Sequence, residues 1–148
     1  MSIRSLLPIA GDAADVAVGF MSFHDLDRLE PAIAEGRRVL RPDGRLHLAI
    51  VHPASSAGSW RESKGATGEP PTFVIDGSYM QSRRDADEVE RDGLTMTFHG
   101  THRPLSMYTN LLTENVLISE RLDEITDPDP TSEWYRIPLF LHLIARRV

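Results

Sequence analysis

Two histidines that follow apolar segments are the residues of this sequence best suited to chemistry. His24 comes shortly after the apolar run 15–22, and His52 comes directly after the apolar run 46–51. An imidazole changes its charge near neutral pH, so it can accept or donate a proton during a reaction. His24 is therefore our leading candidate for a general base, the alternative being that it caps a strand-to-helix turn. We interpret Asp25 as a turn residue rather than as an acid catalyst.

Metal chemistry finds no support in the sequence. The chain contains six histidines and no cysteine. No H-x-x-x-H pattern falls on a predicted helix, and zinc in proteins is held by cysteine, histidine and carboxylate ligands. The sequence therefore predicts no metal site. Trp60 and Trp134 fall in predicted loops, where we expect them to pack locally rather than to form a platform for a substrate.

A predicted strand–helix–strand unit would position both histidines. The run 15–22 is almost continuously apolar and includes β-branched residues, which is typical of a strand buried on both faces. A helix is expected from Asp27, its candidate N-cap, until Pro42-Asp43-Gly44 ends it, and residues 46–51 form the next strand. Such units are right-handed, and ligands of open parallel sheets bind beyond the carboxyl ends of the strands. Residues 22–25 and His52-Pro53 are therefore expected at the ligand-facing edge.

The second half of the chain predicts an insertion followed by a helix and two strands. Residues 54–101 are interpreted as an inserted loop and hairpin, or lid, with strands at 72–75 and 94–98 beside Asp-Gly turns. The charged stretch 83–92 is interpreted as a solvated loop. A helix is expected to start at Pro104. Strands are expected at 116–122 and 139–145, and the link between them is too short for a crossover helix, so this pair is antiparallel.

Three stretches resemble the class I, Rossmann-like S-adenosylmethionine-dependent methyltransferases. LPIAGDAADVAV at 7–18 is similar to the family pattern L-P-F-x-D-x-S-F-D-x-V before the fourth strand. EGRRVLRPDGRL at 35–46 is similar to E-x-x-R-V-L-[RK]-P-G-G-x-L before the fifth strand, and HRPLSMY at 102–108 resembles H-R-P-L-S-x-Y of a subset. Asp43 departs from the usual glycine, and an aspartate tolerates a left-handed turn. Val116 stands where the helix usually ends in glycine, and we expect Asn115 to take that conformation instead.

The resemblance implies an α/β fold with part of a methyltransferase sheet. The expected strand order is 4-5-7-6 of the family sheet, with strand seven antiparallel, in a single domain over residues 1–148. S-adenosylmethionine is the implied cofactor. The resemblance assigns Phe20, Met21, Ser22 and His24 to the cofactor side. It assigns the substrate side to His52, His102, Arg103 and Tyr108. Arg103 could bind a carboxylate, or Arg103 and Tyr108 could pin the lid to the sheet.

The family's glycine-rich cofactor loop is absent from this sequence, as is the acidic residue that binds the ribose. We therefore expect a truncated or split methyltransferase that binds S-adenosylmethionine very weakly or not at all by itself. The alternative is a non-catalytic, methyltransferase-derived module. In either case the edge of the strand at 15–22 would lie open, and open apolar edges pair with other chains. We expect a homodimer or pairing with a separately encoded N-terminal half.

Composition limits the classes of partner. The chain has 148 residues, a net charge of -6 and an isoelectric point near 5.4. Nucleic-acid binding requires a basic surface, so it is not expected. No stretch approaches the length of a membrane span, and the N-terminal apolar run is too short for a signal peptide. The sequence therefore predicts a cytoplasmic protein that acts on a small molecule.

Overall fold

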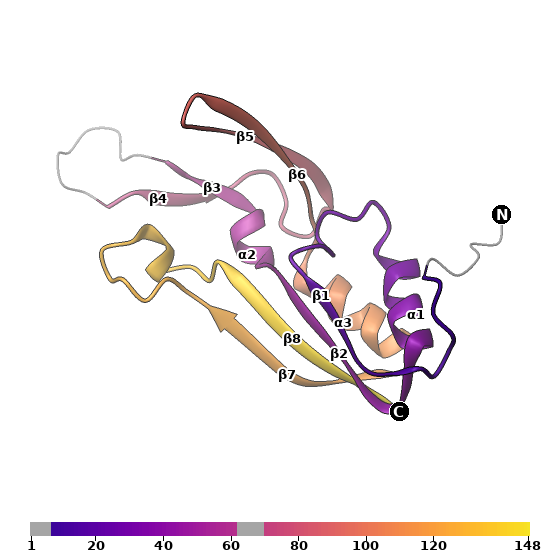
Figure 1. Ribbon diagram of the computed structural model, residues 1–148. Coiled ribbons are helices and arrows are strands. Elements are labelled where there is room, and N and C mark those ends of the chain that lie inside the picture. Colours follow the sequence, from indigo (N-terminus) through magenta and orange to yellow (C-terminus); the bar gives the residue numbers. More distant parts are fainter. Residues whose placement is uncertain (1–6, 62–69) are drawn as a thin grey trace.

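The computed structural model describes residues 7–61 and 70–148 and has a four-stranded sheet at its centre, in the order β1-β2-β8-β7 (Figure 1). The strands are β1 (Ala14–Phe20), β2 (Leu40–Val51), β7 (Leu117–Ile125) and β8 (Phe140–Arg147). β1 and β2 are parallel, and β8 is antiparallel to both β2 and β7. The α/β class, the order and the antiparallel closing strands expected from the sequence are confirmed.

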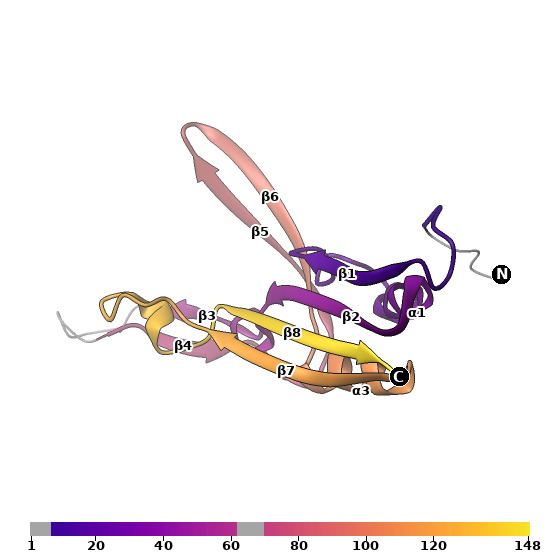
Figure 2. The same cartoon turned by 60° about the horizontal axis from the view of Figure 1, so that its bottom comes forward.

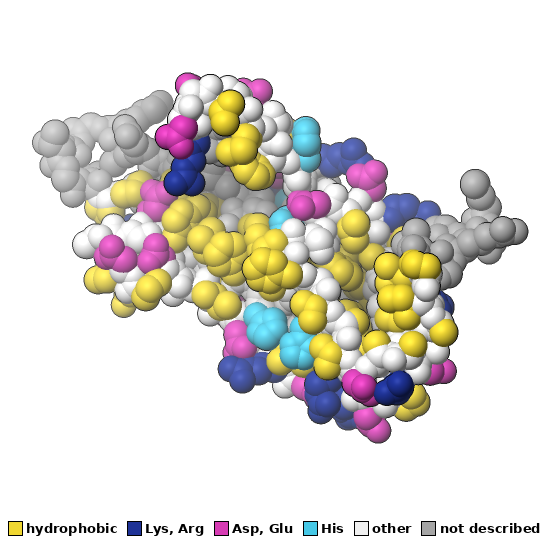
Figure 3. Space-filling model, viewed as in Figure 1, with side chains coloured by type: hydrophobic (Ala, Val, Ile, Leu, Met, Phe, Trp, Pro, Cys, Tyr) yellow, Lys and Arg dark blue, Asp and Glu magenta, His cyan; other side chains and the backbone are white. Residues whose placement is uncertain are grey.

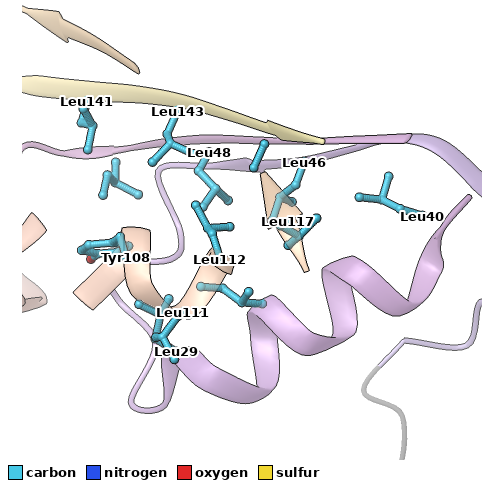
Figure 4. Close-up of a cluster of buried hydrophobic side chains, with 13 residues drawn as sticks. Leu29, Leu40, Leu46, Leu48, Tyr108, Leu111, Leu112, Leu117, Leu141 and Leu143 are labelled. Atoms are coloured by element: carbon cyan, nitrogen blue, oxygen red, sulfur yellow. The ribbon is translucent and has the colours of Figure 1, made fainter. Parts of the chain in front are cut away.

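Two helices cover one face of this sheet. They are α1 (Leu29–Val39) and α3 (Leu105–Glu114). Leu29, Ile33 and Val39 form the buried stripe of α1, because residues three or four positions apart lie on the same side of a helix. Leu46 and Leu48 of β2 meet that stripe, while Leu111 and Leu112 come from α3 (Figure 4). Fully burying one such side chain contributes about 1.5–3 kcal/mol, so this cluster is the main source of stability.

The other face of the sheet is open. Alternate residues of a strand point to opposite faces, and Val16, Val18 and Phe20 of β1 are 53%, 68% and 73% exposed. Figure 3 looks onto the face that is not covered by α3, and hydrophobic side chains gather there. The prediction that the first strand is buried on both faces is therefore wrong for the described residues, because here only its helix-facing side is covered.

Two hairpins stand at one end of the sheet, where the sequence predicted loop and a single hairpin. They are β3 (Gly58–Arg61) with β4 (Thr72–Ile75), and β5 (Arg83–Arg91) with β6 (Leu94–His102). The two predicted strands thus pair with different partners, and the charged stretch read as a solvated loop is a strand. β5–β6 projects away from the sheet (Figure 2), so most of its side chains face water and the apolar alternation that marks a half-buried strand is missing. The remaining elements are the short helices α2 (Pro53–Ser56) and η1 (Glu133–Tyr135).

Local geometry around the helix ends corrects three expectations. The N-cap of α1 is Arg28 rather than Asp27, with no side-chain cap. β2 starts at Leu40 rather than at residue 46, and Asp43 within it adopts the left-handed conformation foreseen for it, with φ of 65°. After α3, Val116 takes the left-handed position with φ of 58°, whereas Asn115 does not. The Asn115 side-chain amide instead donates to the carbonyl of Leu111, and the left-handed residue lies one position later than predicted.

Candidate functional site

A cavity of about 1010 Å³ lies where β1 and β2 end and the two hairpins begin. The segment after β1 contributes Met21 and His24 to its wall, and α2 contributes Ser56. Trp60 of β3 and Arg83 of β5 line the same space. The carboxyl ends of parallel strands are where open α/β sheets bind ligands. The sheet edge predicted to face a ligand therefore opens onto this cavity.

The segment after β1 is held in an unusual conformation under the second hairpin. Met21 has φ of 47°, which non-glycine residues seldom adopt. Its amide donates to the carbonyl of Ala49 at 2.8 Å, and the carbonyl of His24 accepts from the amide of Thr101 at 2.8 Å. Backbone conformations of this kind cost about 1–3 kcal/mol and cluster at functional sites. The strain is maintained by hydrogen bonds that tie β1, β2 and β6 together at the cavity.

His24 has a buried ring nitrogen without a hydrogen-bond partner in the described residues. Its side chain is 14% exposed, and its Nε2 atom lies 3.4 Å from Oδ1 of Asp25. Its Nδ1 atom is buried and has no hydrogen-bond partner within the described residues. Burial lowers the pKa of His24, Asp25 opposes this shift, and the positive charge of Arg103 adds to it. A neutral imidazole with a free nitrogen can accept a hydrogen bond or a proton from a bound molecule.

Ser56 is the meeting point of a second polar cluster. Its Oγ atom lies 2.8 Å from Nδ1 of His102, whose Nε2 atom lies 2.8 Å from the carbonyl oxygen of Tyr79. Nη2 of Arg83 donates to the carbonyl of Ser56 at 2.9 Å. Nε of Arg83 lies 3.2 Å from Asp85, and its buried Nη1 has no partner in the described ranges. The hydroxyl of α2, the imidazole at the end of β6 and the guanidinium at the start of β5 thus meet at Ser56.

The residues predicted for the cofactor side divide into two groups. Met21 and His24 line the cavity. Phe20 is 73% exposed on the open face of the sheet, and Ser22 is exposed; neither is part of the cavity wall. For Phe20 this follows from the strand period, because alternate side chains of β1 point to opposite faces of the sheet.

The residues predicted for the substrate side also separate. His102 lines the cavity, whereas His52, Arg103 and Tyr108 do not. His52 accepts from the amide of Ala54 at 2.9 Å and contacts Glu124 at 3.0 Å, so it caps α2. Burial lowers the pKa of His52, and Glu124 opposes this shift.

Arg103 and Tyr108 are buried beside the cavity rather than in it. Arg103 is 4% exposed and donates to the carbonyls of Leu26 and Asp27. It therefore ties the start of α3 to the segment after β1. Tyr108 is 2% exposed within the main hydrophobic cluster, and burial raises its pKa.

The cavity-wall residues that did not emerge as site residues from the sequence include Ser56, Trp60, Arg83 and Trp134. The rings of Trp60 and Trp134 lie 5.6 Å apart in an edge-to-face arrangement, so the local packing expected for both is present, but at the cavity. The sequence signals for these residues were weak. Serine and arginine are common in loops, and nothing in their spacing shows that hairpins would bring them to the carboxyl end of β2.

No group of three or more His, Asp or Glu side chains in the described residues is arranged to hold a metal ion. None of the described helices is long and apolar enough to cross a membrane.

Sequence comparison links the N-terminal third of the chain to known methyltransferases. Residues 1–48 match the model of a family described as a methyltransferase domain. A segment of 64 residues is 39% identical to the malonyl-[acyl-carrier protein] O-methyltransferase of Methylococcus capsulatus. That segment is 41% of this chain and 23% of the length of that relative.

Structural comparison extends the likeness to nearly the whole chain. A putative S-adenosylmethionine-dependent methyltransferase from Listeria monocytogenes superposes with a TM-score of 0.78, and one from Mesorhizobium loti with 0.73. The identities are 18% and 20%, and the match covers 97% of this chain and 66% of each of the two structures. The 1,6-didemethyltoxoflavin-N1-methyltransferase of Burkholderia thailandensis, with bound 1,6-didemethyltoxoflavin and S-adenosylhomocysteine, matches with a TM-score of 0.53 at 14% identity. That match covers 97% of this chain and 48% of that structure. The chain has the class I S-adenosylmethionine-dependent methyltransferase-like fold, and it spans about 66% of the length of the Listeria and Mesorhizobium structures.

Proposed function

We propose that this chain forms the acceptor side of an S-adenosylmethionine-dependent methyltransferase and that a small molecule occupies the cavity. The observation that carries the proposal is His24: a buried imidazole with a free Nδ1, at the carboxyl end of β1, on a methyltransferase-like fold. The cavity of about 1010 Å³ is large enough for a drug-sized molecule. Its hairpin walls, within residues 54–101, would act as the lid.

The residues available to a cofactor are those that follow β1. S-adenosylmethionine would supply an electrophilic methyl group on a sulfonium. Met21 offers an apolar, polarizable surface, and the free Nδ1 of His24 can accept a hydrogen bond from an ammonium or hydroxyl group. Ser22 and Phe20 adjoin them in sequence and would meet only parts of the cofactor outside the cavity. In methyl transfer the protein has to align the acceptor with the methyl group and remove a proton from the acceptor. His24 is our candidate for the general base that accepts this proton.

Ultraviolet cross-linking with S-adenosylmethionine carrying a labelled methyl group tests this proposal, because a covalent bond records even weak binding. We expect label within residues 20–25, competed by S-adenosylhomocysteine and decreased in His24→Gln. His47→Gln is the matched control, since His47 lies in the middle of β2 and outside the cavity wall. Label spread over the chain without competition would contradict the proposal. Calorimetric titration of the chain alone is expected to give little heat, since its sequence carries no glycine-rich cofactor loop.

A second candidate function, a module that binds a partner through β1, rests on a different observation. Within the described residues β1 pairs on one side only, with β2. Its outward side chains are exposed, and an apolar pocket of about 210 Å³, lined by Val18, Phe23 and Leu46 among others, lies beside it. An edge with unpaired backbone groups and apolar side chains favours pairing with another strand. A homodimer through two β1 edges, or a separately encoded chain at the same edge, would complete the sheet.

Light scattering over a range of concentrations distinguishes this second candidate. We expect Val18→Lys, on the β1 edge, to abolish association. The matched control is Ile118→Lys on β7, at the opposite edge of the same sheet, where the side chain is 50% exposed. A wild-type chain that stays monomeric at every concentration would exclude the homodimer, and equal effects of both substitutions would exclude β1 as the interface.

A further inference from the structure

We propose that Ser56, His102 and Arg83 form a deprotonation site for an acidic hydroxyl, so that the methyl acceptor is a phenol or an enol. The identification of the acceptor rests on the methyl-transfer function proposed above, and for an acidic hydroxyl this cluster takes the role of base that the same proposal gives to His24. The deprotonation site itself rests only on the geometry of the cavity. Three contacts that meet at Ser56 carry the argument, and each of the three side chains lines the cavity.

The hydrogen bonds of His102 define which nitrogen carries its proton. Its Nε2 atom faces the carbonyl oxygen of Tyr79 at 2.8 Å, and a carbonyl only accepts. Nε2 therefore donates. In a neutral imidazole Nδ1 is then the acceptor, and the Ser56 hydroxyl, 2.8 Å away, donates to it. This arrangement of hydroxyl, imidazole and orienting acceptor is the one that activates hydroxyl groups in proteins.

The same cluster can hold an additional proton without losing a hydrogen bond. If His102 is protonated, Nδ1 donates to Oγ of Ser56 and Nε2 still donates to Tyr79. The Ser56 hydroxyl then turns toward the carbonyl of Pro53, which lies 3.3 Å away. His102 is 1% exposed, so Ser56 is the group through which a molecule in the cavity would deliver its proton. Ser56 therefore relays the proton from the cavity, and His102 is the base that holds it.

Arg83 provides the positive charge that a newly formed oxyanion needs. Its Nη2 atom donates to the carbonyl of Ser56 at 2.9 Å, and Asp85 holds its Nε edge at 3.2 Å. Two edges of the guanidinium are thus fixed beside Ser56, while the buried Nη1 has no partner among the described residues. A buried donor without a partner costs about 1–3 kcal/mol. An oxyanion held near Ser56 would remove that cost with a charge-assisted hydrogen bond.

The charges of the cavity wall favour a hydroxyl over a carboxylate. The ionisable groups other than Arg83 that line it are Asp25, Asp76, Asp85, His24, His99 and His102. A carboxylate is already ionised at neutral pH and would meet three aspartates, of which Asp76 pairs with Arg61 and Asp85 pairs with Arg83, while Asp25 lies beside His24. A phenol or enol enters neutral and acquires its charge only beside Arg83. These charges favour an acceptor that enters neutral over one that enters as an anion.

The reaction balances with a methyl sulfonium as co-reactant. The acceptor O–H bond breaks, its proton goes to Oγ of Ser56, and the proton of Ser56 moves to Nδ1 of His102. The electron pair left on the acceptor oxygen forms the new bond to the methyl carbon. The electrons of the broken carbon–sulfur bond return to the sulfur, which becomes a neutral thioether. The proton leaves His102 to solvent after the product is released.

The test uses 4-nitrophenol, whose phenolate absorbs visible light, and requires neither a cofactor nor turnover. At a pH where the free probe is mostly protonated, wild-type protein should increase the phenolate absorbance saturably. We expect the ionisation of the bound probe to shift by about one pH unit, a tenfold change in its equilibrium. Arg83→Gln and Ser56→Ala should abolish the shift. Arg84→Gln should leave it intact, because Arg84 is 71% exposed and pairs with Asp27.

The outcomes separate this inference from the methyl-transfer proposal. Circular dichroism checks that each variant is folded, and His102→Gln is a third variant should Ser56→Ala disturb α2. A probe that does not bind, or one equally ionised in wild type and Arg83→Gln, overturns the deprotonation site. A normal shift together with no specific cross-linking to residues 20–25 would keep the deprotonation site and reject the cofactor side. Transfer to carboxylates in preference to phenols would reject the substrate class.

Discussion

The sheet with its two helices and the wall of the cavity differ in what their side chains bury. The sheet buries leucines and isoleucines against α1 and α3 (Figure 4), and their side chains have no polar atoms to satisfy. The cavity wall contains three of the four buried polar side-chain atoms that lack a partner in the described residues, on His24, Trp60 and Arg83. The fourth belongs to Arg103, next to His102. Stability therefore resides in the sheet, and the capacity to bind resides in the wall.

Removing a large side chain from each region gives the largest contrast. Leu48 of β2 is fully buried between the sheet and the helices, so Leu48→Ala should lower the free energy of unfolding by about 2–5 kcal/mol. Leu94 of β6 is 68% exposed, so Leu94→Ala should change it by less than about 0.5 kcal/mol. Urea unfolding followed by circular dichroism measures both. Equal losses would mean that the projecting hairpin is part of the core.

A methyl group added at Gly58 should disturb the packing of the cavity wall and leave the packing of the central sheet unchanged. A Cβ atom there would lie 1.9 Å from the carbonyl oxygen of Val74 in the paired strand β4. Gly58→Ala should therefore force β3 and β4 apart, at a cost of about 1–3 kcal/mol. Trp60 and Trp134 are the two tryptophans of the chain, so a red shift of fluorescence would report their separation.

Gly100 provides the control for that substitution. It lies on β6 at the same cavity, and a Cβ atom there would meet nothing within 4 Å. Gly100→Ala should leave the fluorescence unchanged. A shift of the same size in both variants would mean that the hairpin wall responds to any change of glycine rather than to the clash at Val74.

The difference between the two regions also explains what the sequence could reveal. Apolar periodicity arises from burial, so the strands and helices of the sheet, including the antiparallel closing pair, were predictable from residues such as Leu46 and Leu48. The hairpin β5–β6 has few buried side chains, and its strand conformation comes from backbone pairing, which leaves no periodic pattern. Its contribution to the cavity, Arg83, was therefore read as part of a charged loop.

The prediction of the site was limited in the same way, because residues that meet only in three dimensions leave no pattern in the sequence. His24 and His102 were found because they follow a strand or lie in a family-like stretch. Ser56 and Arg83 were missed because their meeting depends on three-dimensional placement of α2 and β5. Phe20 shows the opposite error: its position in the sequence is right for the ligand edge, yet its side chain lies on the open face.

Backbone strain in the sheet region should be removable without effect on the wall. Val116 ends α3 with φ of 58°, a conformation costly for a β-branched residue. Val116→Gly should relieve that strain, and after the entropic cost of glycine in the unfolded chain a net gain of up to about 1 kcal/mol is expected. Thr113→Gly, three residues earlier within α3, should instead lose about 1 kcal/mol. Destabilisation by Val116→Gly would show that the valine side chain contributes packing that its 48% exposure does not suggest.

The smallest effect expected is a pH dependence that comes from the wall. Burial lowers the pKa of His24 below its ordinary value of 6.5, with Asp25 acting in the opposite direction. Between the two pKa values the unfolded chain binds more protons than the folded one, so stability falls as the pH falls through this window. The pKa of His52 shifts in the same direction, so His52 should contribute the rest of this pH dependence.

His24→Gln should therefore decrease the loss of melting temperature between neutral and mildly acidic pH while preserving the loss due to His52. Asp25→Asn should increase it, because the carboxylate no longer supports the imidazolium. Thermal melts of the three proteins across this range decide the matter: if the slope is the same in wild type and His24→Gln, His24 is solvated and the wall does not hold it neutral.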